Sequence, residues 1–306
     1  MRRKISIILV LCSVILIAAG LAMGASTGMY WDATGLHLSE KIPHEKQVLA
    51  SFSNLKVDAS SAAVEVIYGE EFSIEYYKGA NAPVISLDGD TFIVKQGPHG
   101  FFLTFGFTLF RTDTIKITLP HGTKLENCNI ITDNGQIKIT GQTADVLTVN
   151  ADNGRVVLSH VTAPYTEIIC QNGELKFDNV RADYLGAHLD NGSISGTGLT
   201  ADKFKISVNN GEVKIQSVSL GKGTINADNG SIKASGTIKN LIAKVGNGAV
   251  NLSLAKADAY YHFLCRNGSI SVDKSHKGSF WESGDPANPD AIRVDAGNGH
   301  IKVDIN

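Results

Sequence analysis

The stretch "DNGQIKITGQTADVLTVNA" (residues 133–151) decides the fold, because its pattern returns along the rest of the chain. The Gly of its Asn-Gly pair recurs every nineteen residues, at Gly135, Gly154, Gly173, Gly192, Gly211 and Gly230. Three more Asn-Gly pairs follow at looser spacing and end at Gly248, Gly268 and Gly299. Repetition at a fixed period of this length is typical of solenoid proteins, in which each unit packs on its neighbours.

Within each unit, apolar and polar residues alternate in two short runs. In the quoted unit, Ile137 and Ile139 flank Lys138, and a second run places Leu147 and Val149 on one face. Alternation with a period of two predicts strands that bury one face. We therefore predict an all-β protein, a right-handed parallel β-solenoid with nineteen residues in each regular coil.

The Asn-Gly pair is expected at a corner of each coil, because both residues tolerate positive φ. Asn amides stacked at one corner can hydrogen-bond from coil to coil. The predicted turn ladder consists of Asn134, Gly135, Asn153, Gly154, Asn172, Gly173, Asn191, Gly192, Asn210, Gly211, Asn229 and Gly230, and it continues at Asn247, Asn267 and Asn298.

The N-terminal segment has a different composition from the repeats. Residues 5–25 are uncharged and follow Arg2, Arg3 and Lys4. A helix of this length crosses a bilayer, and basic residues before it predict a cytoplasmic N-terminus. We predict a cytoplasmic tip at 1–4 and a single-pass transmembrane helix or signal anchor at 5–25, with the body outside the cytoplasm. A cleaved signal peptide is the alternative.

The remaining chain divides into three predicted parts. Residues 26–48 show no strong pattern and are predicted to form a stalk. Residues 49–126 contain short β-like runs bounded by Gly, Pro, Asn or Asp, which predicts an N-terminal β cap on the first coil. Residues 127–306 are predicted to form the solenoid repeats, with a loop inside 269–296 before the final coil.

Charge and motifs exclude several classes of function. The chain has 28 Lys and Arg against 30 Asp and Glu, which argues against a nucleic-acid partner. No hydrolase, zinc or nucleotide-binding motif is present, so we predict no catalytic residue, no metal and no cofactor, and polysaccharide cleavage is an outlier. Cys128, Cys170 and Cys265 are predicted to be buried free thiols.

The Asp residues before the ladder Asn could in principle bind Ca²⁺, since their carboxylates would be aligned. They are Asp133, Asp152, Asp190 and Asp228. Other residues interrupt this column, including Gln171 and Asn209. The prediction is therefore that these Asp side chains form turns.

Two groups of aromatic residues are candidate contact sites. Phe101, Phe102, Phe105 and Phe107 lie in "GPHGFFLTFGFTLF" (97–110), which is predicted either to plug the open end of the core or to contact a membrane or partner. Tyr165 and Tyr184 share one column of the repeat. They could stack on sugars of a wall glycan, or they could only pack at a turn.

The chain resembles bacterial envelope proteins described as putative adhesins with β-strand repeats. The matching features are the apolar N-terminal segment, the opening "FSNLKVDASSAAVEVIYG" (52–69), the serial N-G-x-I-x-I units and the ending "NGHIKVDIN" (298–306). The resemblance covers 49–306 and implies an anchored, extracytoplasmic β-solenoid linked with envelope surfaces or stress. We predict an unknown envelope protein or a wall polymer as its partner. Two functions are predicted: surface interaction as an adhesin, or a regulatory or sensor ectodomain in an envelope-stress system.

Overall fold

The computed structural model of the chain describes residues 28–32, 35–38, 44–77, 82–97, 103–106, 113–255 and 258–305. All regular elements in these ranges are β-strands, which confirms the all-β prediction. The predicted tip at 1–4 and the predicted membrane helix at 5–25 lie outside the described residues. Within the described ranges, no helix has the length and apolarity that spanning a bilayer requires.

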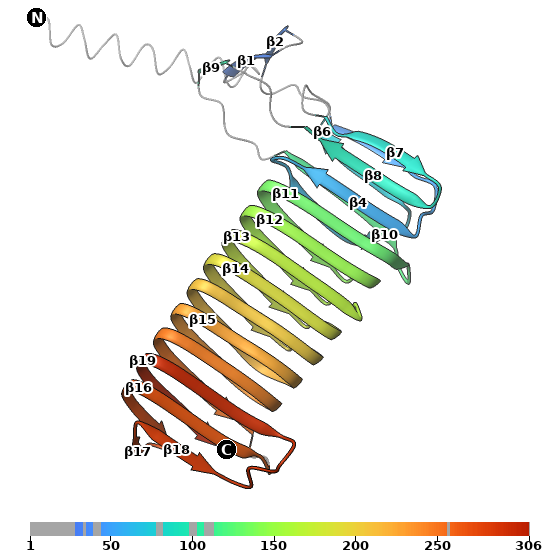
Figure 1. Cartoon of the computed structure of the whole chain (residues 1–306). Coiled ribbons are helices and arrows are strands. Elements are labelled where there is room, and N and C mark those ends of the chain that lie inside the picture. Colours follow the sequence, from blue (N-terminus) through green and yellow to red (C-terminus); the bar gives the residue numbers. More distant parts are fainter. Residues whose placement is uncertain are drawn as a thin grey trace, which may run out of the picture.

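Five successive strands form the body of the molecule by pairing in parallel. They are β11 (Lys124–Thr140), β12 (Thr143–Ser159), β13 (Tyr165–Asp178), β14 (Arg181–Thr197) and β15 (Thr200–Leu254). Gly135 lies opposite Gly154 and Gly173 lies opposite Gly192, so each strand pairs with the equivalent residues of the next unit. Figure 1 shows these strands stacked coil upon coil into a rod, with β15 running through several coils.

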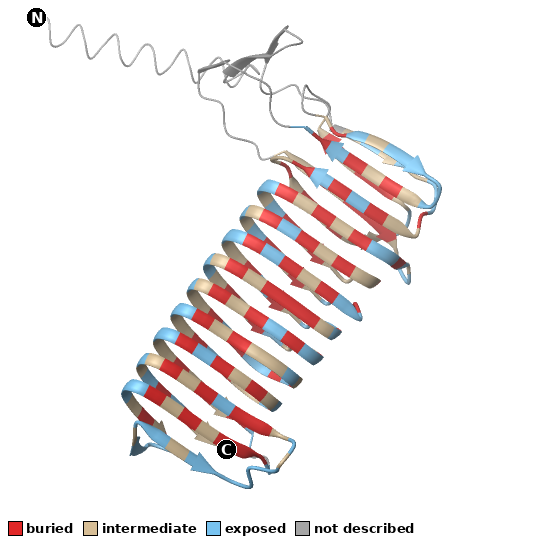
Figure 2. Cartoon of the chain, viewed as in Figure 1, coloured by how far each residue is buried: buried red, intermediate tan, exposed pale blue. Residues whose placement is uncertain are grey.

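Each strand turns alternate side chains into the interior of the rod. In β11, Ile137 and Ile139 are buried, whereas Gln136 is exposed and Lys138 is half-buried. The same alternation appears as bands along every coil in Figure 2. Burying an aliphatic side chain contributes about 1.5–3 kcal/mol relative to leaving it exposed. A single coil has no interior of its own, so the stability comes from stacking.

A second corner lies six residues after the corner Gly; two turns in each unit were expected, but the position of this one was not predicted. The residues at this corner are Gly141, His160, Asn179, Gly198 and Ser217, and all of them have positive φ. Gly, Asn and His adopt this conformation more readily than Ser does. Because the column mixes four residue types, no repeated motif marks the corner in the sequence.

The N-terminal β unit continues the same stack. β4 (Asn54–Ala59) and β5 (Ala63–Gly69) both pair in parallel with β11 and together form one further coil. β8 (Thr91–Gln96) and β10 (Thr114–Pro120) pair in parallel with β4 and β5 in the same way. Ser61 and Ala62 stand at the corner of the first added coil, so the Asn-Gly pattern does not extend to it.

Antiparallel strands complete the N-terminal end of the rod. β6 (Ser73–Tyr77) pairs with β10 and with β3 (His44–Val48), and β7 (Val84–Asp88) pairs with β8. β3 belongs to the segment 26–48 that was predicted as a stalk, although its sequence lacks a clear alternating pattern. A three-stranded sheet joins β2 (Gly35–Leu38), β1 (Gly28–Asp32) and β9 (Leu103–Gly106).

The last coil in the sequence is not the last coil of the rod. β19 (Ala291–Ile305) pairs in parallel with β15 on one side and with β16 (Tyr260–Val272) on the other, as Figure 1 shows. β17 (Ser275–Gly278) and β18 (Phe280–Ser283) pair antiparallel with β16 and cover its outer edge. The expectation of a plain loop within 269–296, followed by a terminal coil, was therefore wrong. β17 and β18 form there, and β19 lies between β15 and β16.

Candidate functional site

The Asn side chains of neighbouring coils are hydrogen-bonded along the rod. Nδ2 of Asn153 donates to Oδ1 of Asn134 at 3.2 Å. Equivalent bonds of 2.7–3.0 Å continue the ladder through Asn172, Asn191, Asn210, Asn229, Asn247, Asn298 and Asn267. Each interior Asn therefore donates one side-chain bond and accepts another, so these amides hold the coils together.

The Gly beside each ladder Asn is required by the close approach of adjacent coils. Gly154 has a φ of 145° and Gly192 a φ of 134°, a region that L residues with side chains rarely adopt. A Cβ placed on Gly154 would overlap the carbonyl oxygen of Gly135, and a Cβ on Gly192 would overlap that of Gly173. Both the backbone conformation and the space exclude a side chain here.

Asp152 and Asp190, two of the Asp residues beside the ladder, accept hydrogen bonds from the next coil. Oδ1 of Asp152 accepts a bond from Nε2 of Gln171 at 3.1 Å, and Oδ1 of Asp190 accepts one from Nδ2 of Asn209 at 2.7 Å. In the part of the chain that the structure describes, no group of three or more His, Cys, Asp or Glu side chains could hold a metal ion. Asp152 and Asp190 therefore extend the polar ladder.

Asp190 also belongs to a Ser–His–Asp chain that the sequence analysis did not predict. Nε2 of His188 lies 3.1 Å from Oδ1 of Asp190, and Nδ1 lies 2.8 Å from Oγ of Ser207. Acyl transfer by such a chain also needs hydrogen-bond donors aimed at an oxyanion. Here the side chains project from the paired strands β14 and β15, whose backbone groups are engaged with each other. We interpret the chain as a link between coils. The one sequence feature that predicts this contact is that His188 and Ser207 occupy the same column of the repeat.

The three cysteines of the body are free and buried. Burial raises the pKa of the Cys128 thiol to about 12. It also raises the pKa of Cys170 and of Cys265. A thiol that stays protonated at neutral pH is a poor nucleophile and metal ligand. These side chains therefore act as small core residues.

Tyr165 and Tyr184, the predicted contact residues of the repeat, lie side by side on β13 and β14. Their rings are stacked, with centroids 5.2 Å apart and planes inclined by 20°. Tyr165 is 39% exposed, and its hydroxyl donates to Oε2 of Glu167 at 2.7 Å. This bond raises the pKa of the Tyr165 hydroxyl. Tyr184 lies against Gly186, which has no side chain to displace it. We call Tyr165 and Tyr184 the tyrosine pair.

The Phe-rich segment is mostly outside the described residues. Phe101, Phe102 and Phe107 are not described, and Phe105 lies in β9, which pairs antiparallel with β1. Its roles as a core plug and as a contact surface both stay predictions.

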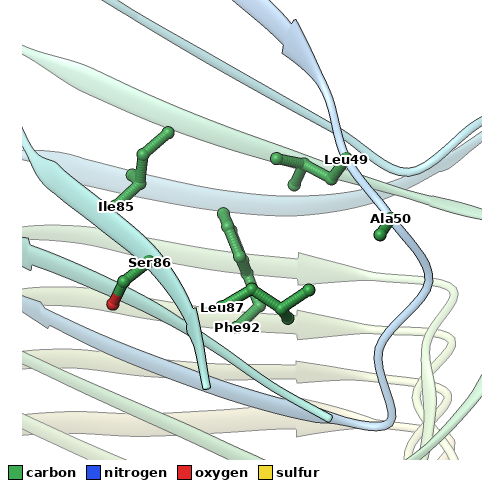
Figure 3. Close-up of a pocket in the computed structure, with 6 residues that line it drawn as sticks. All are labelled: Leu49, Ala50, Ile85, Ser86, Leu87 and Phe92. Carbon is green, nitrogen blue, oxygen red and sulfur yellow. The ribbon is translucent and has the colours of Figure 1, made fainter. Parts of the chain in front are cut away.

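A small apolar cavity lies at the N-terminal end of the rod. It has a volume of about 200 Å³ and is lined by Leu49, Ala50, Ile85, Ser86, Leu87 and Phe92. Figure 3 shows Leu49, Ile85, Leu87 and Phe92 around one space beside β7 and β8. Its side chains include one hydroxyl and no ionisable group, so the lining offers no acid–base chemistry.

Comparison with known proteins agrees with this architecture. A family model described as Toastrack DUF4097 matches residues 52–304. The chain belongs to the Toastrack DUF4097 family. The match confirms the resemblance that the repeat units carry. No curated protein matches this Toastrack chain in sequence.

Several solved structures are similar to this Toastrack chain. A putative adhesin from Bacteroides fragilis is 14% identical, with 86% of this chain and 97% of that chain covered and a TM-score of 0.38. A putative adhesin from Parabacteroides merdae is 13% identical, with 86% and 96% covered and a TM-score of 0.29. A putative cell adhesion protein from Clostridium sporogenes is 11% identical, with 86% and 99% covered and a TM-score of 0.23.

Proposed function

We propose that this Toastrack protein is a membrane-anchored, extracytoplasmic adhesin or surface-interaction protein of the bacterial envelope. In this proposal the helix at 5–25 anchors the chain in the cell membrane, and a right-handed solenoid stands outside the cytoplasm. The protein acts by binding a wall polymer or another envelope protein, without catalysis, metal or cofactor. The observation that carries the proposal is the tyrosine pair, whose stacked rings lie partly exposed on one flank of the rod.

The tyrosine pair departs from the composition of its own column. Equivalent positions on neighbouring coils carry Val146, Lys203 and Lys222. Tyr165 is exposed and Tyr184 is half-buried, and aromatic residues are enriched at contact surfaces. Two stacked rings also lose little conformational freedom on binding, which favours affinity. The pair therefore supports a contact function for this flank.

The chemistry around the pair fits a polysaccharide. Aromatic rings pack against the apolar faces of sugars, and the carboxylate of Glu167 beside Tyr165 can accept hydrogen bonds from sugar hydroxyls. The Asn ladder holds the coils at a spacing of about 4.8 Å, so the flank presents a rigid, repeating surface. A rigid repeating surface is suited to a rigid repeating polymer.

Sedimentation of the full chain with isolated cell walls tests the proposal. The variant Tyr165→Ala/Tyr184→Ala should bind walls about tenfold more weakly, because two stacking contacts are lost. The matched control Lys203→Ala/Lys222→Ala changes the same column and should bind within about twofold of wild type. Both variants should keep their thermal unfolding transition. Equal sedimentation of the tyrosine variant and wild type would show that this flank is not the contact surface.

A further inference from the structure

A groove between two columns of polar side chains lies on the other flank of the rod, across the Asn-Gly corner from the tyrosine pair. It has a volume of about 260 Å³ and spans four adjacent coils of β15 and β19. One wall is the outward column Lys214, Lys233, Asn251 and Lys302. The facing wall is the column two residues further along each strand, formed by Gln216, Ser235, Ser253 and Asp304. The groove therefore follows the rod axis.

The packing of β19 against β15 decides which residues complete the groove. Lys302 pairs in register with Asn251, and Asp304 with Ser253. If the coils followed the order of the sequence, the coil of β16 would occupy this place and would bring Ser271 to the position of Lys302. The third lysine of the wall is thus a consequence of the coil order.

The walls carry three ammonium groups and one carboxylate. Nζ of Lys233 lies 2.6 Å from Oε1 of Glu212, at the outer margin of the groove. Nζ of Lys302 lies 3.6 Å from Oδ2 of Asp304. Lys214 is exposed and forms no ion pair with any residue that the structure describes. The groove is therefore locally basic, although the whole chain has a net charge of −2.

The cations influence the neighbouring acid. A hydrogen bond from Lys233 is the main cause of the lowered pKa of the Glu212 carboxyl, and the charge of Lys214 adds to it. This carboxylate satisfies only one of the three lysines, so an added anion would still meet uncompensated positive charge at Lys214. Charge complementarity at the groove consequently favours an anionic ligand over a neutral one.

We infer that this groove binds a linear polysaccharide bearing carboxylate groups, with the sugar chain lying along the rod axis. Coils repeat at about 4.8 Å, which is comparable to the length of one sugar residue, so successive sugars meet equivalent positions. The lysine wall pairs with the carboxylates. The amide and hydroxyl groups of the facing wall hydrogen-bond with sugar hydroxyls. The inference names a second surface and does not depend on the tyrosine pair.

Fluorescence anisotropy with labelled polygalacturonate oligomers tests the groove in the full chain. The variant Lys214→Gln/Lys233→Gln/Lys302→Gln should weaken binding about tenfold, since three ionic contacts are lost. The matched control Lys203→Gln/Lys205→Gln/Lys222→Gln removes the same charge from the other flank and should bind within about twofold of wild type. Binding of the wild type should also weaken as salt concentration rises.

Three comparisons separate a groove from general charge attraction. Neutral dextran of the same length should bind about tenfold more weakly than polygalacturonate, and inorganic polyphosphate should bind more weakly because it lacks hydroxyls. Equal losses of affinity in the two triple Lys→Gln variants would overturn the inference. Dextran or polyphosphate binding as tightly as polygalacturonate would also overturn it, as would no binding of polygalacturonate by the wild type. The Tyr165→Ala/Tyr184→Ala variant and the variant without the three groove lysines are each measured with polygalacturonate and with isolated cell walls, so failure at one flank is distinguishable from failure at the other.

Discussion

Nδ2 of Asn298 donates to Oδ1 of Asn247 at 2.7 Å, although 51 residues separate them in the chain. Asn267, the next ladder Asn after Asn247 in the sequence, donates instead to Asn298. These two bonds follow from the position of β19 between β15 and β16, and they join the last two coils to the ladder. The same inward position brings Lys302 to the groove beside Asn251.

The position of an Asn in the ladder should determine how much it stabilises the rod. Asn191 donates to Asn172 and accepts from Asn210, whereas Asn134 accepts only the ladder bond from Asn153. Asn191→Ala is expected to lower the free energy of unfolding by about 1–2 kcal/mol, and Asn134→Ala by about half as much, because a net hydrogen bond contributes about 1 kcal/mol. Urea unfolding of both variants measures the difference. Equal losses would mean that the ladder bonds add nothing beyond each local turn.

A side chain at the first corner should be strongly destabilising. Gly192→Ala places a Cβ where the carbonyl oxygen of Gly173 lies, and the backbone cannot move without disturbing both coils. We expect a loss of more than about 3 kcal/mol in the free energy of unfolding. Gly97→Ala is the control, because an added Cβ meets open space and the residue does not have positive φ. It should stay within about 0.5 kcal/mol of wild type. A mild effect of Gly192→Ala would contradict the close approach of the coils.

The second corner offers a stabilising substitution. Ser217 has a φ of 52°, a conformation that costs a residue with a side chain about 1–2 kcal/mol. Ser217→Gly removes this cost but adds backbone entropy to the unfolded chain, so a net gain of up to about 1 kcal/mol is expected. Asn179→Gly at the same corner should gain less, because Asn tolerates positive φ. Thermal unfolding ranks the two variants. A larger gain for Asn179→Gly would contradict this order.

Burial of Cys128 should make the rod sensitive to alkaline pH. Its pKa is raised to about 12 in the fold, from an ordinary value of 9.0, because burial disfavours the thiolate. The folded state therefore binds more protons than the unfolded state between these values. This contribution to stability is fully present below pH 9.0 and is lost as the pH rises toward about 12.

The variant Cys128→Ala isolates this effect from other alkaline titrations. The difference in free energy of unfolding between wild type and variant, measured by urea at several pH values, should shift against the wild type as pH rises above 9.0. A constant difference across this range would show that the thiol ionises equally in both states. Lack of reaction with a thiol reagent in the native protein, and full reaction in urea, would give independent support.

Much of the rod is predictable because its contacts repeat. The alternation of Ile137 and Ile139 with polar residues predicts which face is buried. The spacing of the Asn-Gly pairs predicts the register in which β11 pairs with β12. The tyrosine pair follows from the same rule, since residues in one column become neighbours when coils stack. The second corner is harder to predict, because its column mixes residue types and positive φ at Ser217 is imposed by the coil and not by residue type.

By itself, the sequence determined the strands, the parallel stacking and the Asn ladder, because alternation and period act between adjacent units and recur in every coil. Only the tertiary structure decided the order of the last coils. The local pattern predicts neither that β19 pairs with β15 nor that β17 and β18 pair with β16, because these pairings join segments that do not follow the order of the repeats. The structure also decided that residues 54–120 add coils without an Asn-Gly corner. The groove depends on both the sequence repeat and the tertiary structure. Lys214 and Lys233 are aligned by the repeat, whereas Lys302 joins their column only because β19 pairs with β15.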